Sequence, residues 1–208
     1  NEDIGYTYSY DMLGEAARTE ADAKRYHLSY SAAISAMAGA CTHADIRDNP
    51  GISVKLSALH PRYEVAQRDR VMTELVPRVR ALAFLAKAAG MGFNIDAEEA
   101  DRLELSTEVI AEVLRDPALA KWDGFGVVVQ AYGPRGTHVI DWLHTLASRL
   151  DRRIMVRLVK GAYWDYEVVV ARQNGWPIPV YTHKAETDAA FERSAEKILR
   201  NHDLCNFA

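Results

Sequence analysis

Five short apolar runs in this chain each end in a polar or charged side chain, followed by a turn and a stretch with a helical pattern. The runs end at Asp11, Lys55, Asp96, Gln130 and Lys160. This repetition is typical of parallel strands whose carboxyl ends share one edge of a sheet. In a β/α barrel that edge is the mouth, where side chains from several strands converge and chemistry takes place. The pattern therefore predicts an α/β fold and the place of a functional site together.

Strands and helices are expected to alternate along the whole chain. We predict strands over residues 6–12, 52–56, 93–96, 126–131 and 153–159, and helices over about 18–38, 64–89, 107–114, 138–150 and 185–200, with another helix after residue 165. Pro77 lies within the second of these helices and predicts either a kink or two shorter helices. Short connections between successive units favour a (β/α)8 TIM-type barrel.

The length limits how much of such a barrel the sequence can contain. The chain has 208 residues, whereas a complete eight-unit barrel takes about 250. A strand pattern begins almost at once, and a new apolar run begins after Asn201, just before the sequence stops. We therefore expect one domain, residues 1–208, that is a barrel fragment of about the first five to six β/α units, truncated at both ends.

Composition and spacing argue against several classes of protein. The formal net charge of −4 leaves no basic footprint for nucleic acid, so this segment is expected to have no nucleic-acid partner. Cys41 and Cys205 lie far apart with no CxxC pair or metal-ligand spacing, so we predict no metal site and two reduced thiols, as suits a cytoplasmic protein. No apolar run reaches the roughly 20 residues of a membrane span. No GxGxxG follows a strand, which argues against a Rossmann dinucleotide fold.

Cations stand in two of the predicted strands. Arg157 lies in an apolar run, where its guanidinium must be paired or face an anion. One interpretation is a structural brace with Asp96, and the other is a ligand contact at the mouth. Lys55 shares a strand face with Ser53 and Ser57, which predicts a polar pocket, although a lysine that extends to the rim explains the pattern too.

Gln130, Asp11 and a segment near residue 184 also have alternative interpretations. Gln130 either presents its amide to a ring edge or satisfies backbone groups, and Asp11 either pairs with a cation or caps the following turn. Thr182, Lys184 and Thr187 lie where a proline-rich loop gives way to a helix, a position suited to phosphate. N-capping by either threonine is the alternative.

Other charged residues are expected to be structural. The acidic run after Asp96 is interpreted mainly as a helix start, with Glu99, Asp101 and Arg102 in that role. Arg152 and Arg153 are expected to form a solvated strand start. Taken together, the phosphate-type segment, the cations at the mouth and the aromatics of residues 160–164 indicate a large anionic cofactor with a flat ring.

Four longer motifs carry a resemblance to a known family. In order, they are YSYDMLGEA, KLSALHPRY, NIDAEEADRLE and RLVKGAYWD. Over nearly its whole length the chain resembles the proline dehydrogenase domain of the bacterial bifunctional proline utilization A flavoproteins. The resemblance implies a β/α barrel that binds FAD and oxidises L-proline to Δ1-pyrroline-5-carboxylate by hydride transfer to flavin N5, the first step of proline catabolism to glutamate. It also implies a membrane quinone as electron acceptor, an aldehyde dehydrogenase domain in the full-length protein, and peripheral association with the inner membrane.

The resemblance also assigns roles to single residues. Lys55 and Tyr163 match substrate-side groups, Asp11 matches an acidic gate residue at the proline entrance, and Arg157 matches the arginine near flavin N5. The residues that match cofactor contacts are Asp96, Ala97, Gln130, Arg157, Val159, Lys160, Gly161, Ala162, Trp164, Thr182, Lys184 and Thr187. Hydride transfer requires a neutral proline amine, and we expect a lysine or a water to help take its proton.

The family pattern is not complete in this sequence. His183 stands where family members often carry arginine. The family's helix that grips the proline carboxylate would follow residue 208, so we expect this segment to be incomplete alone. Two other functions stay open: an aldolase that uses Lys55 as a Schiff base, and a truncated barrel kept as an interaction or scaffold module. Flavin absorbance distinguishes the flavoenzyme from the aldolase.

Overall fold

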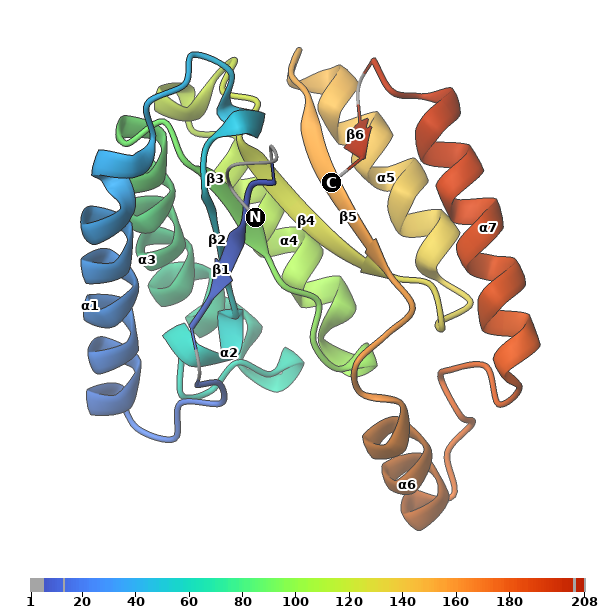
Figure 1. Cartoon of the computed structure of the whole chain (residues 1–208). Helices are drawn as coiled ribbons and strands as arrows, with labels where there is room; N and C mark the ends of the chain where they lie inside the picture. The colour runs from blue at the N-terminus through green and yellow to red at the C-terminus, as the bar shows by residue number, and fades with distance from the viewer. Residues whose placement is uncertain (1–5, 13, 204, 208) are drawn as a thin grey trace.

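The computed structural model describes residues 6–12 and 14–203, and the backbone of residues 205–207. Within this described part, six parallel strands form one sheet in which every strand lies beside its neighbour in sequence (Figure 1). The strands are β1 (Ser9–Asp11), β2 (Gly51–Val54), β3 (Gly92–Ile95), β4 (Phe125–Gln130), β5 (Ile154–Val159) and β6 (Cys205–Phe207). Sequential parallel pairing is the arrangement of a β/α barrel wall, and it confirms the predicted fold class.

The described residues form α-helices, most of which cover one side of this curved sheet (Figure 1). They are α1 (Glu20–Met37), α2 (Leu56–Leu59), α3 (Arg68–Ala88), α4 (Leu103–Leu114), α5 (Gly136–Arg149), α6 (Trp164–Asn174) and α7 (Lys184–Arg200). In Figure 1, α1 and α3 lie beside the first strands and α5 and α7 beside the last, while α6 lies apart, beyond the carboxyl ends of the strands. None of the helices in the described residues is long and apolar enough to cross a bilayer.

The two faces of the sheet differ in chemistry because successive strand residues point to opposite sides. In β4, Phe125, Val127 and Val129 belong to the main hydrophobic core with side chains of the surrounding helices. The opposite face carries Ser53 of β2, Arg157 of β5 and, directly after β3, Asp96, and Arg157 donates to both of the others. The apolar face therefore holds the helices in place, and the polar face is left for a site.

Helix α3 continues across Pro77, so of the two alternatives predicted there, a kink or two shorter helices, the second is wrong. Proline in a helix interior removes one backbone hydrogen bond and costs about 3 kcal/mol. Successive turns of this helix are buried against the core through Val71, Leu75, Val79 and Leu82. This burial offsets the local cost, since each fully buried side chain of this kind contributes about 1.5–3 kcal/mol.

Three local expectations also differ from the structure. Strand β2 ends at Val54 because Lys55 is the N-cap of the short helix α2, which the sequence pattern did not predict. Helix α4 begins at Leu103 rather than at Thr107, whose hydroxyl donates to the Glu104 carbonyl inside the helix. Arg152 is buried rather than solvated, and its guanidinium donates to the carbonyls of Leu119 and Trp122. Burial lowers the pKa of Arg152 to about 10.

Candidate functional site

A cluster of opposite charges joins four strands at their carboxyl ends. Asp96 lies 2.6 Å from Lys55 Nζ through one carboxylate oxygen and 2.5 Å from Arg157 Nη2 through the other. Asp11 lies 3.6 Å from the same lysine nitrogen. The second terminal nitrogen of Arg157, Nη1, donates to Ser53 Oγ at 2.9 Å. The predicted residues Asp11, Lys55, Asp96 and Arg157 are thus brought together, and the Arg157–Asp96 pair exists.

Strand register explains why these side chains meet. Val54 of β2 is paired with Ile95 of β3, and the Asp96 amide donates to the Val54 carbonyl at 3.0 Å. The next residue along each strand, Lys55 and Asp96, therefore lies at the same height and on the same face. Because parallel strands all run in one direction, the polar residue that ends each apolar run reaches the same rim.

The cluster keeps Lys55 in its charged form. Burial alone would lower the pKa of Lys55, but the hydrogen bond and charge of Asp96, together with the charge of Asp11, outweigh it, so the pKa lies above its ordinary value. A lysine with a raised pKa donates hydrogen bonds at neutral pH and does not accept a proton. Asp96, which is 7% exposed, is the carboxylate that permits two cations to lie this close together.

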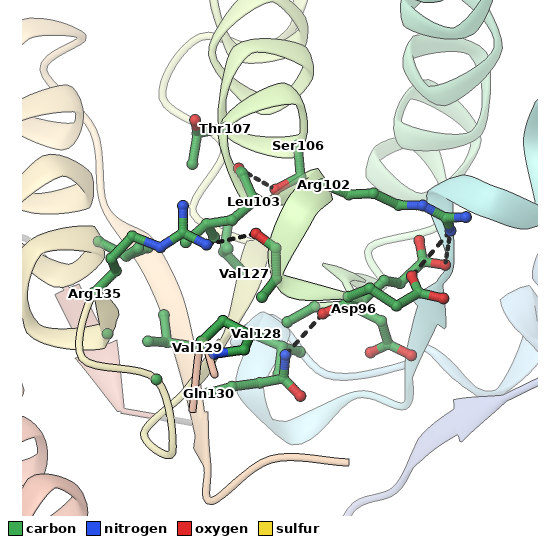
Figure 2. A pocket seen from close by; sticks show the side chains of 18 of the residues that line it. Asp96, Arg102, Leu103, Ser106, Thr107, Val127, Val128, Val129, Gln130 and Arg135 are labelled. Atoms are coloured by element: carbon green, nitrogen blue, oxygen red, sulfur yellow. Dashed lines mark hydrogen bonds and ion pairs between the residues drawn. The ribbon is translucent and has the colours of Figure 1, made fainter. Parts of the chain in front are cut away.

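Gln130 connects two loops of the rim. Its side-chain amide donates to the Glu98 carbonyl at 2.9 Å, and its carbonyl oxygen accepts from the Ala162 amide at 3.0 Å. Figure 2 shows Gln130 and Asp96 at the ends of neighbouring strands. Of the two interpretations of Gln130, these contacts fulfil the one in which its amide satisfies backbone groups.

A cavity lies beside this rim, between β4 and the helices α4 and α5 (Figure 2). Its wall includes apolar side chains of β4 and α4, such as Val129 and Ile110, and Asp96, Ala97 and Gln130 also line it. Arg157 does not line the cavity but joins it through its ion pair with Asp96. Asp96 and Gln130 therefore line one cavity, and Arg157 contacts that cavity only through Asp96.

The segment after β5 keeps its backbone close to a neighbouring ring. Gly161 has a φ of +144°, and a Cβ at this position would collide with the ring of Tyr132. Val159 before it is half-buried, and so is Gly161 itself, while Ala162 after it is exposed. Glycine is therefore the residue that this close approach requires.

The aromatic residues of this segment have polar partners. Tyr163 donates to the carboxylate of Glu15 at 3.1 Å, and burial together with Glu15 raises the pKa of Tyr163 well above its usual range. Trp164 is 41% exposed, and its indole nitrogen donates to the Tyr181 carbonyl at 2.8 Å, in the loop before α7. The two rings thus connect the end of β5 to loops from both ends of the chain.

Two lysines from different elements meet near the start of α7. Lys160 and Lys184 each lie 2.5 Å from one carboxylate oxygen of Asp188. Thr182 is exposed, and Thr187 is buried in the first turns of α7. Two ammonium groups beside a helix start form a surface suited to a phosphate.

The N-cap of α7 is neither of the predicted threonines. The helix begins after His183, whose amide donates to the Glu186 carboxylate at 3.3 Å. The capping alternative for Thr182 and Thr187 is therefore wrong. It fails because His183 occupies the position just before the first helical residue, one residue after Thr182.

Sequence patterns missed one buried acid at the site. Glu98 is 9% exposed and accepts a hydrogen bond from the Ser57 amide at 3.0 Å. Burial raises its pKa to about 6. In the sequence it is one member of an acidic run, and nothing in that run distinguishes it from Glu99 or Asp101. Its partner lies 41 residues away, so no local signal reports the contact.

The whole chain matches a known family. The family model described as "Proline dehydrogenase" matches residues 1–208. The chain belongs to the proline dehydrogenase family.

Similar proteins support this membership. The chain is 54% identical over 199 residues to the bifunctional protein PutA of Salmonella typhimurium, covering 95% of this chain and 15% of that protein. It is 54% identical over 201 residues to PutA of Rhizobium meliloti, covering 96% of this chain and 16% of that protein. The chain thus spans about a sixth of the length of these curated relatives.

Solved structures agree with the fold. A variant of proline utilization A from Bradyrhizobium japonicum is 52% identical and superposes with a TM-score of 0.94, over 98% of this chain and 21% of that one. Proline utilization A from Bdellovibrio bacteriovorus is 32% identical with a TM-score of 0.93, over 99% of this chain and 23% of that one, in a form inactivated by N-propargylglycine.

Proposed function

We propose that this chain forms part of an FAD-dependent proline dehydrogenase, which oxidises L-proline to Δ1-pyrroline-5-carboxylate as the first step of proline catabolism to glutamate. The observation that carries this proposal is the charge cluster in which Asp96 holds both Lys55 and Arg157 at the strand ends, in a chain of the proline dehydrogenase family. Residues 1–208 are proposed to be part of a single barrel domain. The word "bifunctional" in the names of the relatives supports a second domain, and we propose from the family resemblance that it is an aldehyde dehydrogenase.

The residues at the rim suit a large anionic cofactor. Lys160 and Lys184 converge on the single carboxylate of Asp188, which leaves one net positive charge at this place for a phosphate group. A Cβ at Gly161 would collide with the ring of Tyr132. The absence of a side chain at Gly161 leaves the backbone open to close approach by a ligand. We assign FAD contacts to Asp96, Ala97, Gln130, Arg157, Val159, Lys160, Gly161, Ala162, Trp164, Thr182, Lys184 and Thr187.

The bound flavin supplies a hydride acceptor, and the protein residues position the substrate for it. Charged Lys55 is a donor for the proline carboxylate, with Tyr163 beside the substrate and Asp11 at its entrance. Asp96 fixes the positions of Lys55 and Arg157 by holding one on each oxygen. Since Lys55 keeps its own proton, the proton that leaves the proline amine goes to water.

The pKa of Lys55 also bears on the alternative of a Schiff-base aldolase. A nucleophilic lysine needs a lowered pKa so that a neutral amine is present at neutral pH. The direction here is the opposite, because Asp96 raises the pKa of Lys55. Lys55, the residue on which the aldolase would depend, is therefore held in the wrong protonation state for a Schiff base, and this favours the flavoenzyme proposal.

Electron transfer and location are proposed from the same resemblance. A membrane quinone is the proposed electron acceptor, and the protein is proposed to be cytoplasmic with peripheral association with the inner membrane. This segment is not proposed to bind nucleic acid, because its formal net charge is −4.

The substitution Arg157→Met tests the proposal. It removes the guanidinium that pairs with Asp96 but keeps an unbranched side chain in the strand, so we expect weaker FAD binding and slower oxidation of L-proline. Bound flavin is measured by its visible absorbance, and its bleaching by L-proline is followed without oxygen. Arg47→Met, which removes an exposed arginine paired with Asp45, is the matched control. Unchanged FAD content and unchanged proline oxidation in Arg157→Met would refute the assignment.

A further inference from the structure

The loop that follows Asp96 leads into a helical turn whose first amide has no capping side chain from the neighbouring residues that the structure describes. Its 3-10 turn spans Ala100–Arg102, and among the described residues the preceding Glu99 makes no side-chain capping bond. The first amides of a helical turn need an acceptor from elsewhere. The Ala100 amide donates to Glu167 Oε1 at 2.6 Å, a carboxylate 67 residues further along the chain on α6. Glu167 thus caps this turn from another β/α unit.

Glu167 is buried among groups that are mostly acidic. The residue is 6% exposed, and burial raises the pKa of its carboxyl, as do the charges of Asp101 and Glu99. The Ala100 amide and the charge of Arg135 act in the opposite direction. A carboxylate that is buried at this cost must gain from its hydrogen bond, and Ala100 is the partner that supplies it.

Arg135 holds the same loop residue from the other side. Its Nη2 donates to the Ala100 carbonyl at 2.5 Å from the position just before α5. In Figure 2 the Arg135 side chain extends across the cavity to this loop. The amide and the carbonyl of one residue are therefore fixed by side chains from two different β/α units.

These contacts connect the two loops that carry the site. Gln130 ties the Glu98 carbonyl to the Ala162 amide, and Glu167 ties Ala100 to the first turn of α6, which begins directly after the segment 160–163. Asp96 opens the loop that is held in this way. The position of Asp96 opposite Arg157 therefore depends on Gln130 and Glu167, which do not themselves belong to the charge cluster.

We propose that Glu167 is a positioning residue of the flavin site, which fixes the loop of residues 96–102 through Ala100 and so holds Asp96 in its ion pairs with Lys55 and Arg157. This inference rests on the proposed function, because it assumes that the Asp96–Arg157 pair lies against the cofactor. It assigns Glu167 no contact with substrate or cofactor.

Amide exchange and flavin binding test the proposal together, in the purified, flavin-loaded protein. Loss of a hydrogen bond to a charged acceptor in Glu167→Ala should accelerate deuterium exchange at Ala100 by about 10- to 100-fold and weaken FAD binding. Glu167→Gln keeps an oxygen acceptor at the same place and should restore both. Glu112→Ala on α4, which removes a solvated carboxylate paired with Arg115, should change neither. If Glu167→Ala fails to fold, Glu167→Asp takes its place in the experiment. Its side chain is one methylene shorter, so the carboxylate is withdrawn from the Ala100 amide.

Three results would overturn the proposal: unchanged exchange at Ala100, faster exchange with FAD affinity unchanged, or a glutamine variant that behaves like the alanine variant. The comparison with Arg157→Met distinguishes a wrong role for Glu167 from a wrong proposed function. If Arg157→Met loses flavin while Glu167→Ala keeps it, only the role of Glu167 falls. If Arg157→Met keeps its flavin and its activity, the flavin site itself is misplaced.

Discussion

Replacing Asp96 with asparagine removes the one charge that holds the cluster together. The asparagine side chain has nearly the same shape and can still accept one hydrogen bond, but Lys55 and Arg157 would then face each other without their shared carboxylate. Asp11 remains, at 3.6 Å from Lys55 and with its side chain 54% exposed. It compensates only a small part of the loss, because exposed charges are screened by water.

The expected loss of stability follows from burial. Removal of one partner from a buried ion pair costs about 3–5 kcal/mol. The Asp96 side chain is 6% exposed, but those of Lys55 and Arg157 are 18% and 31% exposed and still reach water. Because both cations still reach water, the lower end of this range of energies applies. Asp96→Asn should therefore lower the free energy of unfolding by about 3 kcal/mol. The pKa of Lys55 should fall too, since Asp96 is the group that raises it.

Urea unfolding at neutral pH measures the change. Asp45→Asn is the matched control, because Asp45 also binds an arginine, but with both side chains largely exposed. Asparagine can keep the capping bond that Asp45 accepts from the Arg47 amide. If Asp96→Asn destabilised the protein no more than Asp45→Asn, the reasoning from burial would be wrong.

Two further substitutions test single features of the site. Burial raises the pKa of Glu98 from 4.5 to about 6, so its contribution to stability falls as pH rises through that window. Glu98→Gln, which can still accept from Ser57, should therefore raise the free energy of unfolding by up to about 2 kcal/mol at about pH 7.5 and by little at about pH 4. Gly161→Ala should cost about 1–3 kcal/mol in urea unfolding, because φ is +144° and the new methyl group meets Tyr132. Gly39→Ala, with no atom within 4 Å, should show no such loss, and equal effects of the two alanines would contradict the steric argument.

Much of the fold could be predicted because each strand carries its own signal. The runs that end at Lys55, Asp96 and Gln130 form neighbouring strands in sequential order, and parallel direction brings their ends together. Pro77 shows where local preference fails, since the helix that contains it is held by burial along its whole length. Helix α4 begins at Leu103, four residues before the predicted start at Thr107, whose hydroxyl donates to the Glu104 carbonyl inside the helix.

The contacts that hold the site loops could not be predicted in the same way. Glu98 binds an amide 41 residues away, and Glu167 binds one 67 residues away. In each case the acceptor is a carboxylate in an ordinary helical or acidic stretch, and the donor is a backbone group that carries no sequence signal. The burial of Arg152 has no signal in the sequence for the same reason, because both of its partners are backbone carbonyls. A contact between a side chain and a distant backbone group can therefore be identified only from the folded structure.

The inner face of the sheet is what separates this protein from a barrel with a packed interior. Barrel interiors are commonly filled by layers of branched apolar side chains. Here Ser53, Asn94 and Gly126 lie in register across β2, β3 and β4. Gly126 fits only because it has no side chain, since a Cβ there would collide with the amide oxygen of Asn94. Polar atoms in this layer contribute little packing energy, so the apolar face under the helices must supply the stability, and the interior is left to the charges that surround Asp96.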